Sequence, residues 1–121
     1  MGRRILIVED NPSNRLLIKD VLEFQGYEII EAEDGQGGID MAKKYKPDLI
    51  IMDIQMPKMD GITAGKIIRD DPDTKDIKII AVTSFAMLGD KERIIEAGFD
   101  QYISKPINTR ELPGLIKEFL K

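Results

Sequence analysis

The sequence contains no cysteine and no histidine among its 121 residues. Without cysteine the chain forms no disulfide, and it has neither a thiolate nucleophile nor a zinc-thiolate site. Without histidine it has no imidazole to act as a general base or a metal ligand, and it carries no phosphohistidine of its own. These absences leave carboxylates, hydroxyls, amides and amines as the reactive groups.

Long hydrophobic runs and clustered positive charge are also missing. No apolar run approaches the roughly 20 residues that a transmembrane helix needs, and Met1 leads through Arg3 and Arg4 into a run too short for a signal peptide. The formal net charge is -4 and the basic residues are scattered, which disfavours nucleic acid as a partner. We therefore expect a cytoplasmic protein that neither inserts into a membrane nor binds nucleic acid.

Apolar runs of strand length alternate with helical patterns along the chain. The runs that predict strands are Arg4–Val8, Glu28–Ala32, Leu49–Asp53, Ile77–Thr83 and Tyr102–Ser104. Helices are expected between them, the first opening at Asn11-Pro12 and the last near Asn108 and Glu111, which have capping-box spacing. The alternation predicts an α/β fold for residues 1–121 as one domain. Its doubly wound sheet has five parallel strands in the flavodoxin-like order 2-1-3-4-5, with helices on both faces.

Polar side chains stand at the carboxyl ends of four predicted strands. They are Glu9-Asp10, Asp53, Thr83-Ser84 and Lys105-Pro106. Because ligands of open parallel sheets bind at this edge, we expect these side chains to form one site.

The acidic members of this set predict a cation site. The carboxylates of Glu9, Asp10 and Asp53 would repel one another without a cation, and hard oxygen ligands suit Mg²⁺ or Mn²⁺ better than zinc. Together the metal and Lys105 would neutralise the cluster, which could then receive a phosphoryl group on Asp53 as the nucleophile. Lys105 and the hydroxyl of Thr83 would stabilise its oxygens.

Each of these residues also has an ordinary structural interpretation. Asp10 could cap the first helix, and Asp53 could begin a turn. Thr83 could bond to backbone, Lys105 could be solvated and Tyr102 could pack without switching. Only their combination favours phosphoryl chemistry.

The same residues resemble the receiver domains of two-component response regulators over essentially the whole chain. The matching segments are Val8-Glu9-Asp10-Asn11, Met52-Asp53-Ile54-Gln55-Met56-Pro57, Asp60-Gly61, Ala81-Val82-Thr83-Ser84 and Tyr102-Ile103-Ser104-Lys105-Pro106. Any one of these motifs is weak, but the ordered set at these separations is very specific.

The resemblance implies that a histidine kinase or a phosphotransfer domain donates a phosphoryl group to Asp53. Magnesium would be bound by Asp10, Asp53 and the backbone carbonyl of Gln55, with Glu9 acting mainly through a metal-bound water. The family's reaction is a slow phosphorylation and dephosphorylation of the domain itself, so we expect a phosphoacceptor and not an enzyme.

The resemblance also implies a switch and an output surface. Thr83, Ser84 and Lys105 would bind the phosphoryl group, and Thr83 and Tyr102 would act as the switch residues. Their movement would remodel the surface of the fourth helix, fifth strand and fifth helix, where a downstream protein binds. The Lys105-Pro106 peptide bond is expected to be cis.

A finer resemblance rests on Phe85-Ala86-Met87-Leu88-Gly89-Asp90 and Gly98-Phe99-Asp100, which are similar to bacterial single-domain regulators of the DivK type and to receivers of hybrid kinases. We expect a stand-alone regulator, monomeric unless phosphorylation drives dimerisation. A receiver cut from a hybrid histidine kinase stays open as an alternative. A magnesium-dependent aspartyl-phosphate phosphatase is disfavoured, because such enzymes need a second aspartate where this chain has Gln55.

Overall fold

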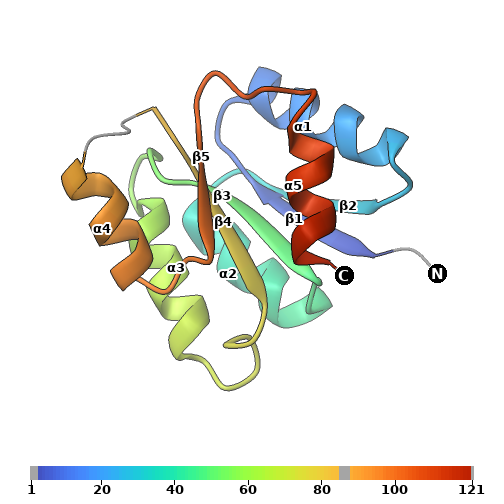
Figure 1. Cartoon of the computed structure of the whole chain (residues 1–121). Coiled ribbons are helices and arrows are strands. Elements are labelled where there is room, and N and C mark those ends of the chain that lie inside the picture. Colours follow the sequence, from blue (N-terminus) through green and yellow to red (C-terminus); the bar gives the residue numbers. More distant parts are fainter. Residues whose placement is uncertain (1–2, 85–87, 121) are drawn as a thin grey trace.

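The computed structural model describes residues 3–84 and 88–120 (Figure 1). Its strands are β1 (Arg4–Val8), β2 (Glu28–Ala32), β3 (Leu49–Asp53), β4 (Lys78–Thr83) and β5 (Gln101–Ser104). Its helices are α1 (Pro12–Phe24), α2 (Gly35–Tyr45), α3 (Gly61–Asp70), α4 (Leu88–Glu96) and α5 (Leu112–Phe119). Phe85, Ala86 and Met87, which carry part of the finer resemblance, lie outside the described residues.

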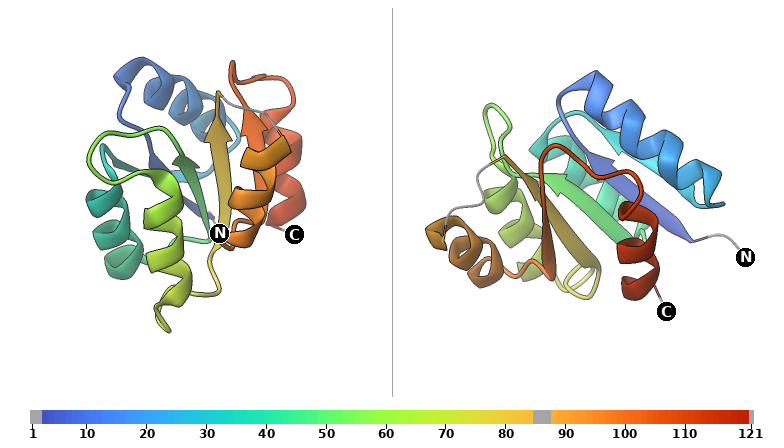
Figure 2. Two further views of the ribbon diagram at one scale, coloured as in Figure 1. Left: turned by 90° about the vertical axis from the view of Figure 1, so that its left-hand side faces the viewer. Right: turned by 45° about the horizontal axis from the view of Figure 1, so that its top comes forward.

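The five strands form one parallel sheet in the order β2-β1-β3-β4-β5, which confirms the predicted fold class. Helices α1 and α5 cover one face of the sheet, and α2, α3 and α4 cover the other (Figures 1 and 2). Because a strand projects successive side chains to opposite faces, β1 supplies both cores. Ile5 and Ile7 pack with α1 and α5, whereas Leu6 and Val8 pack under α2 and α3.

Short polar side chains fix where the helices begin. The Asn11 side chain accepts hydrogen bonds from the backbone N–H groups of Ser13 and Asn14 at 2.9 and 3.1 Å, and Pro12 takes the first helical position of α1. Asp34 caps α2 and Asp60 caps α3 in the same way. The cap of α1 is thus Asn11, so the carboxylate of Asp10 is left for another role.

Three predicted boundaries differ from the structure. Strand β4 begins at Lys78 because the N–H of Ile77 closes a turn onto Thr74, and β5 begins one residue early, at Gln101. Helix α5 begins at Leu112 and not at the predicted cap. The Asn108 side chain does accept bonds from the N–H groups that follow, but a regular helix from that point would need an N–H at Pro113, which proline lacks.

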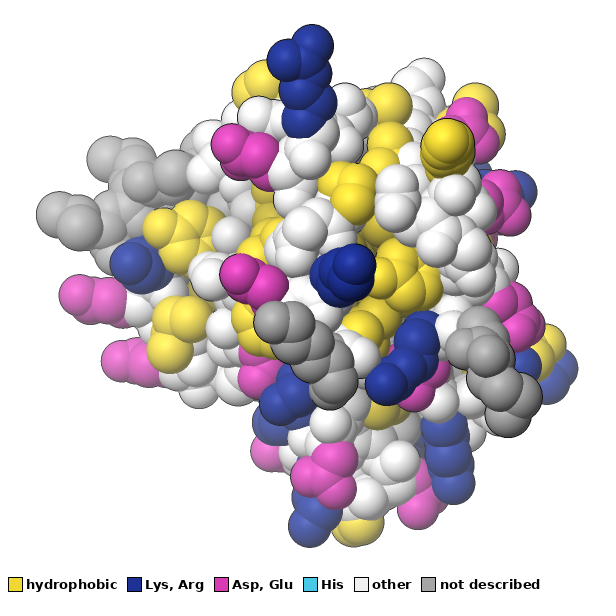
Figure 3. Space-filling model, turned by 45° about the vertical axis from the view of Figure 1, so that its right-hand side comes forward, with side chains coloured by type: hydrophobic (Ala, Val, Ile, Leu, Met, Phe, Trp, Pro, Cys, Tyr) yellow, Lys and Arg dark blue, Asp and Glu magenta, His cyan; other side chains and the backbone are white. Residues whose placement is uncertain are grey.

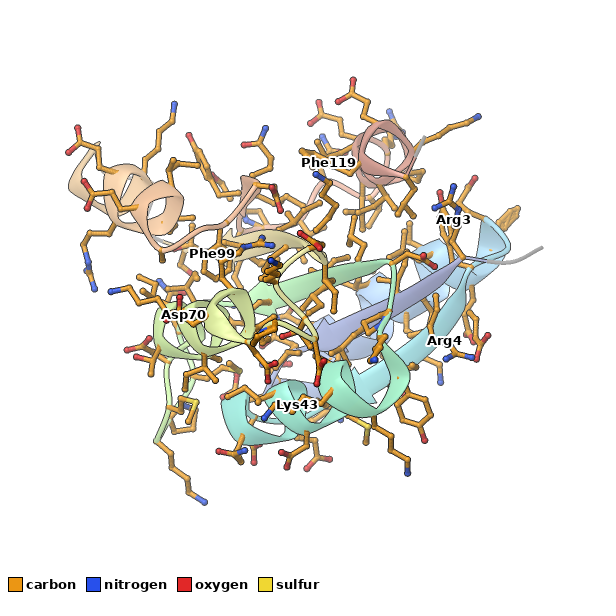
Figure 4. All side chains as sticks on the ribbon, turned by 90° about the horizontal axis from the view of Figure 1, so that it is seen from below. Arg3, Arg4, Lys43, Asp70, Phe99 and Phe119 are labelled. Carbon is orange, nitrogen blue, oxygen red and sulfur yellow. The ribbon has the colours of Figure 1, made fainter. Side chains whose placement is uncertain are left out.

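Figure 4 looks at the molecule from below, on the side away from the carboxyl ends of the strands. Arg3 and Arg4 mark the start of β1 there, and Asp70 marks the end of α3. Among the residues that the structure describes, none of the helices has the length and apolar character needed to cross a bilayer.

Candidate functional site

Strand register brings the predicted polar residues to one edge of the sheet. Val8 pairs with Met52, Asp53 with Val82, and Thr83 with Ser104, so the strands end nearly level. The residues that end or follow them therefore lie side by side, although they are separated by up to about a hundred positions in the sequence.

Carboxylates from two of these strand ends form a cluster. One ligand oxygen from each of Glu9, Asp10 and Asp53 lies within 4.8 Å of the other two. Glu9 and Asp53 are almost completely buried, with 1% and 2% of their surface exposed, while Asp10 is exposed at the mouth. The arrangement gives a deep pair of carboxylates with a third at the surface.

Lys105 compensates part of this charge. Its Nζ lies 3.2 Å from Oδ2 of Asp53 and 3.6 Å from Oε1 of Glu9. The residue follows β5, and the Lys105-Pro106 peptide bond is cis, as expected. One ammonium thus faces a cluster of three acidic groups, which retains the capacity to attract a cation.

Glu9 is the member of the cluster whose negative charge is poorly stabilised. Burial, followed by the hydrogen bond and the charge of Asp53, raises the pKa of Glu9 from its ordinary 4.5 to about 8, and Lys105 opposes this only in part. Its hydrogen bonding is also incomplete: among the described residues, Glu9 Oε1 is a buried oxygen with no hydrogen-bond donor, the ammonium of Lys105 lying 3.6 Å away. A divalent cation would satisfy that oxygen and replace the proton.

Gln55 connects the nucleophile strand to the end of β4. Its backbone N–H donates to Oδ1 of Asp53 at 3.0 Å, and its side-chain oxygen accepts from the N–H of Ser84 at 3.1 Å. Its Nε2 lies 3.4 Å from the hydroxyl oxygen of Thr83, which is buried. Asp53, Thr83 and Ser84 are therefore held in one hydrogen-bonded group.

Gly61 allows helix α3 to start against the end of β3. A Cβ at this position would lie 2.8 Å from the Cα of Ile54 and closer still to the carbonyl oxygen of Asp53. No side chain larger than hydrogen fits that approach without moving the backbone that carries Asp53. The Asp60-Gly61 segment is thus part of the site's support.

The structure brings together Glu9, Asp10, Asp53, Gln55, Thr83, Ser84 and Lys105. Tyr102 lies apart on β5, half-buried against the core beneath α4, with Lys91 Nζ 5.6 Å from its ring centroid. Sequence reasoning missed Arg15, which donates to the backbone oxygen of Glu9. Its other partners are Glu31 on β2 and Glu33 just after it, and these come close to Arg15 only in the folded protein. No local sequence pattern could therefore reveal the role of Arg15.

Comparison with known proteins agrees with this geometry. The family model for the response regulator receiver domain matches residues 5–117. The chain belongs to the response regulator receiver family. Members of this family are signalling regulators of two-component systems and not classical enzymes, which confirms that part of the prediction.

The receiver is DivK-like in sequence. It is 44% identical over 120 residues to the polar-differentiation response regulator DivK of Brucella anthropi, covering 99% of this chain and 98% of the relative, and equally identical to DivK of Brucella ovis. Among solved structures it is similar to the chemotaxis protein CheY4 of Vibrio cholerae, with a TM-score of 0.93 and 28% identity over 98% of this chain and 99% of that one.

A second solved structure contains the metal that the acidic cluster suggests. The receiver domain of a sensor histidine kinase from Pseudomonas aeruginosa has a magnesium ion coordinated in its active-site cleft. This receiver matches it with a TM-score of 0.91 and 34% identity, covering 99% of this chain and 98% of that one.

Proposed function

We propose that this receiver accepts a phosphoryl group on the Asp53 carboxylate from a phosphohistidine of a histidine kinase or phosphotransfer domain. The observation that carries the proposal is the juxtaposition of three clustered carboxylates with Lys105, whose Nζ lies 3.2 Å from Asp53. Since the chain has no histidine, the donor imidazole must belong to another protein. We further propose that residues 1–121 act as one cytoplasmic regulatory domain.

The transfer would proceed by attack of an Asp53 oxygen on phosphorus. The new O–P bond forms as the P–N bond of the donor breaks, and the imidazole leaves with the electron pair of that bond. Lys105 already contacts Asp53 and would neutralise a developing phosphoryl oxygen, while Thr83 and the N–H of Ser84 would bind the others. Gln55 would hold the end of β3, which carries Asp53, beside the end of β4 and Ser84.

Magnesium is proposed as the cofactor, with Mn²⁺ as a substitute. Glu9, Asp10, Asp53 and the backbone carbonyl of Gln55 would hold it, and the buried Glu9 oxygen without a donor supports this assignment. When bound, the cation would neutralise phosphoryl oxygens and allow the acidic cluster to accept further negative charge.

Thr83 and Tyr102 would transmit phosphorylation of the site to the protein surface. We propose that Thr83 moves toward the phosphoryl group and that Tyr102 turns inward, which alters the surface of α4, β5 and α5. This surface includes a groove of about 430 Å³ between β5 and α5, lined partly by Tyr102, Pro106, Leu112 and Leu115. A downstream protein would read this change, and the receiver would be a monomer before phosphorylation.

An aspartyl-phosphate phosphatase remains disfavoured. Such an enzyme needs a carboxyl group two residues after the nucleophile to transfer a proton to the leaving group, and Gln55 is an amide that cannot do so. The side-chain oxygen of Gln55 is moreover engaged with Ser84. The phosphoryl group should therefore persist as a signal.

The test is phosphorylation by acetyl phosphate with Mg²⁺, followed by intact mass spectrometry. We expect the wild type to gain one phosphoryl group, Asp53→Asn to gain none, and Asp40→Asn, which changes an exposed carboxylate on α2, to behave as the wild type. Equal labelling of wild type and Asp53→Asn would overturn the proposal. Size-exclusion chromatography of the phosphorylated protein would test whether it dimerises.

A further inference from the structure

We infer that Arg15 is a positioning residue for the cation site, acting through the backbone of Glu9 and not through the metal-binding carboxylates. The inference rests on the proposed function and adds a residue to it. Arg15 is the fourth residue of α1, just after the β1–α1 connection that carries Glu9 and Asp10. Its side chain is only 15% exposed, whereas those of its acidic partners Glu31 and Glu33 are 37% and 81% exposed.

The guanidinium joins three parts of the fold. Nη1 donates to the carbonyl oxygen of Glu9 at 2.8 Å. Nε lies 3.3 Å from a carboxylate oxygen of Glu31 on β2, and Nη2 lies 3.7 Å from one of Glu33, just after β2. A planar fork of donors can make these contacts at once, so Arg15 ties the end of β1 to the end of β2 through α1.

Both backbone groups of Glu9, its carbonyl and its N–H, are hydrogen-bonded. The N–H of Glu9 donates to the carbonyl of Ala32 at 3.1 Å, as a continuation of the β1–β2 ladder. Two residues later, the carbonyl of Asn11 accepts from the backbone N–H of Arg15 at 3.0 Å. Asp10 therefore lies in a short segment held at both ends, one of them by the Arg15 side chain.

This arrangement specifies how Arg15 should affect metal binding. Removing a positive charge beside an acidic cluster would strengthen cation binding if charge alone mattered. Releasing the Glu9 carbonyl would instead let the Glu9–Asn11 segment relax and weaken binding, because ligands that are not held in place bind metals less tightly. The two effects have opposite signs, so the direction of the change identifies the role.

The experiment is calorimetric titration of the protein with MgCl₂ at constant ionic strength. We expect Arg15→Ala to raise the dissociation constant for Mg²⁺ about 10-fold. The matched control is Lys19→Ala, because Lys19 Nζ also pairs with Glu31, at 3.5 Å. Lys19→Ala should bind Mg²⁺ as the wild type does, because it leaves the bond to the Glu9 carbonyl intact.

Arg15→Lys separates geometry from charge. Lysine keeps the charge but lacks the planar fork whose three nitrogens reach the Glu9 carbonyl and both carboxylates, so this variant should also bind Mg²⁺ more weakly than the wild type. Unchanged or tighter binding by Arg15→Ala, or by Arg15→Lys if the alanine variant fails to fold, would overturn the inference. Circular dichroism melts in EDTA identify which variants fold.

Amide spectra of the metal-free protein give a second readout. In EDTA, Arg15→Lys should shift the ¹⁵N–¹H resonances of Asp10 and Asn11, whereas Lys19→Ala should leave them in place. Unshifted resonances in the arginine variant would count against positioning. A wild type that bound no Mg²⁺ would refute the cation site of the proposed function, and these spectra would still decide whether Arg15 positions the segment.

Discussion

Glu9 combines near-complete burial with a carboxylate neighbour, so its protonation differs between the folded and the unfolded protein. Its pKa is raised to about 8 in the folded protein, chiefly by burial and then by Asp53. Between pH 4.5 and about 8 the folded state therefore holds a proton that the unfolded state has released. Since the folded state binds more protons in this window, stability falls as pH rises through it.

We predict that the metal-free protein loses more than about 1 kcal/mol of unfolding free energy between about pH 5 and about pH 8. Urea denaturation in EDTA at several pH values would measure it. In Glu9→Gln, which keeps the shape but cannot ionise, the decline should be much smaller. A decline of the same size in both proteins would assign it to other groups.

At the scale of residues, the sequence predicted which polar side chains come together but not the residues that support them. The cluster of Glu9, Asp10, Asp53 and Lys105 could be predicted because each residue directly ends or follows an apolar strand, and parallel strands align their ends. Arg15 could not be predicted, because its contacts depend on α1 lying over the end of β2. Burial of Glu9 is likewise a property of packing and not of spacing.

Two glycines at helix starts should respond to alanine in opposite directions. In α5, a Cβ at Gly114 would meet nothing within 4 Å, so Gly114→Ala should raise the unfolding free energy by about 0.5–1 kcal/mol through lower chain entropy in the unfolded state. At the start of α3, Gly61→Ala should lower it by about 1–3 kcal/mol, because the added carbon meets the backbone of β3. Urea titration of both variants checks the signs, and destabilisation by Gly114→Ala would refute the account of α5.

Arg69 fastens α3 to the segments that enter β4 and β5. It donates to the carbonyls of Gly98 at 3.0 Å and Ile77 at 2.8 Å, and also to that of Lys75. It pairs as well with Asp100, at 3.1 Å, whose carboxylate accepts from the N–H of Ile79. The guanidinium thus satisfies backbone oxygens in irregular segments that have no strand partner for them.

We predict that Arg69→Ala lowers the unfolding free energy by about 2 kcal/mol or more, because several carbonyls lose a charged donor. The control is Arg3→Ala, which removes a pair with Asp48 at 3.9 Å between two half-exposed side chains and should cost less than about 0.5 kcal/mol. Thermal and urea unfolding monitored by circular dichroism would measure both. Equal, small losses would show that Arg69 is not a structural clamp.

Element positions followed closely from the sequence, and the late start of α5 has a specific cause. The first three strands were predicted to the residue because turn residues flank each apolar run. Helix α5 begins later than its capping signal because Pro113 lacks the N–H that a helix from Asn108 requires. A cap motif indicates where a helix can start, but a helix forms there only if the residues that follow can make the helical hydrogen bonds.

For the molecule as a whole, cation binding should raise the stability of the folded state. A ligand that binds only the folded state stabilises it by mass action, by about 2.7 kcal/mol at 100 times its dissociation constant. We predict an upward shift of the melting temperature with MgCl₂ at about pH 8, where Glu9 releases its proton. The shift should be largely lost in Asp10→Asn, whose exposed side chain contributes little to folding. A shift of equal size in that variant would place the cation elsewhere.

One face of the molecule combines charges of both signs with an apolar band. On the face drawn in Figure 3, Lys and Arg side chains lie among Asp and Glu around a band of hydrophobic side chains. This mixture agrees with the scattered charges and the formal net charge of -4 of the sequence. Which residues form the apolar band could not be predicted, because helix orientation is set by packing.

The position of Lys105 has a consequence for how the chain matures. Glu9 emerges first from the ribosome and Asp53 midway, whereas the ammonium that offsets them arrives with the last strand. A nascent protein that has reached only β4 would bury two acids with nothing to offset them, which opposes premature closure of the sheet. The sheet should therefore close only once the segment that carries this amine has been made.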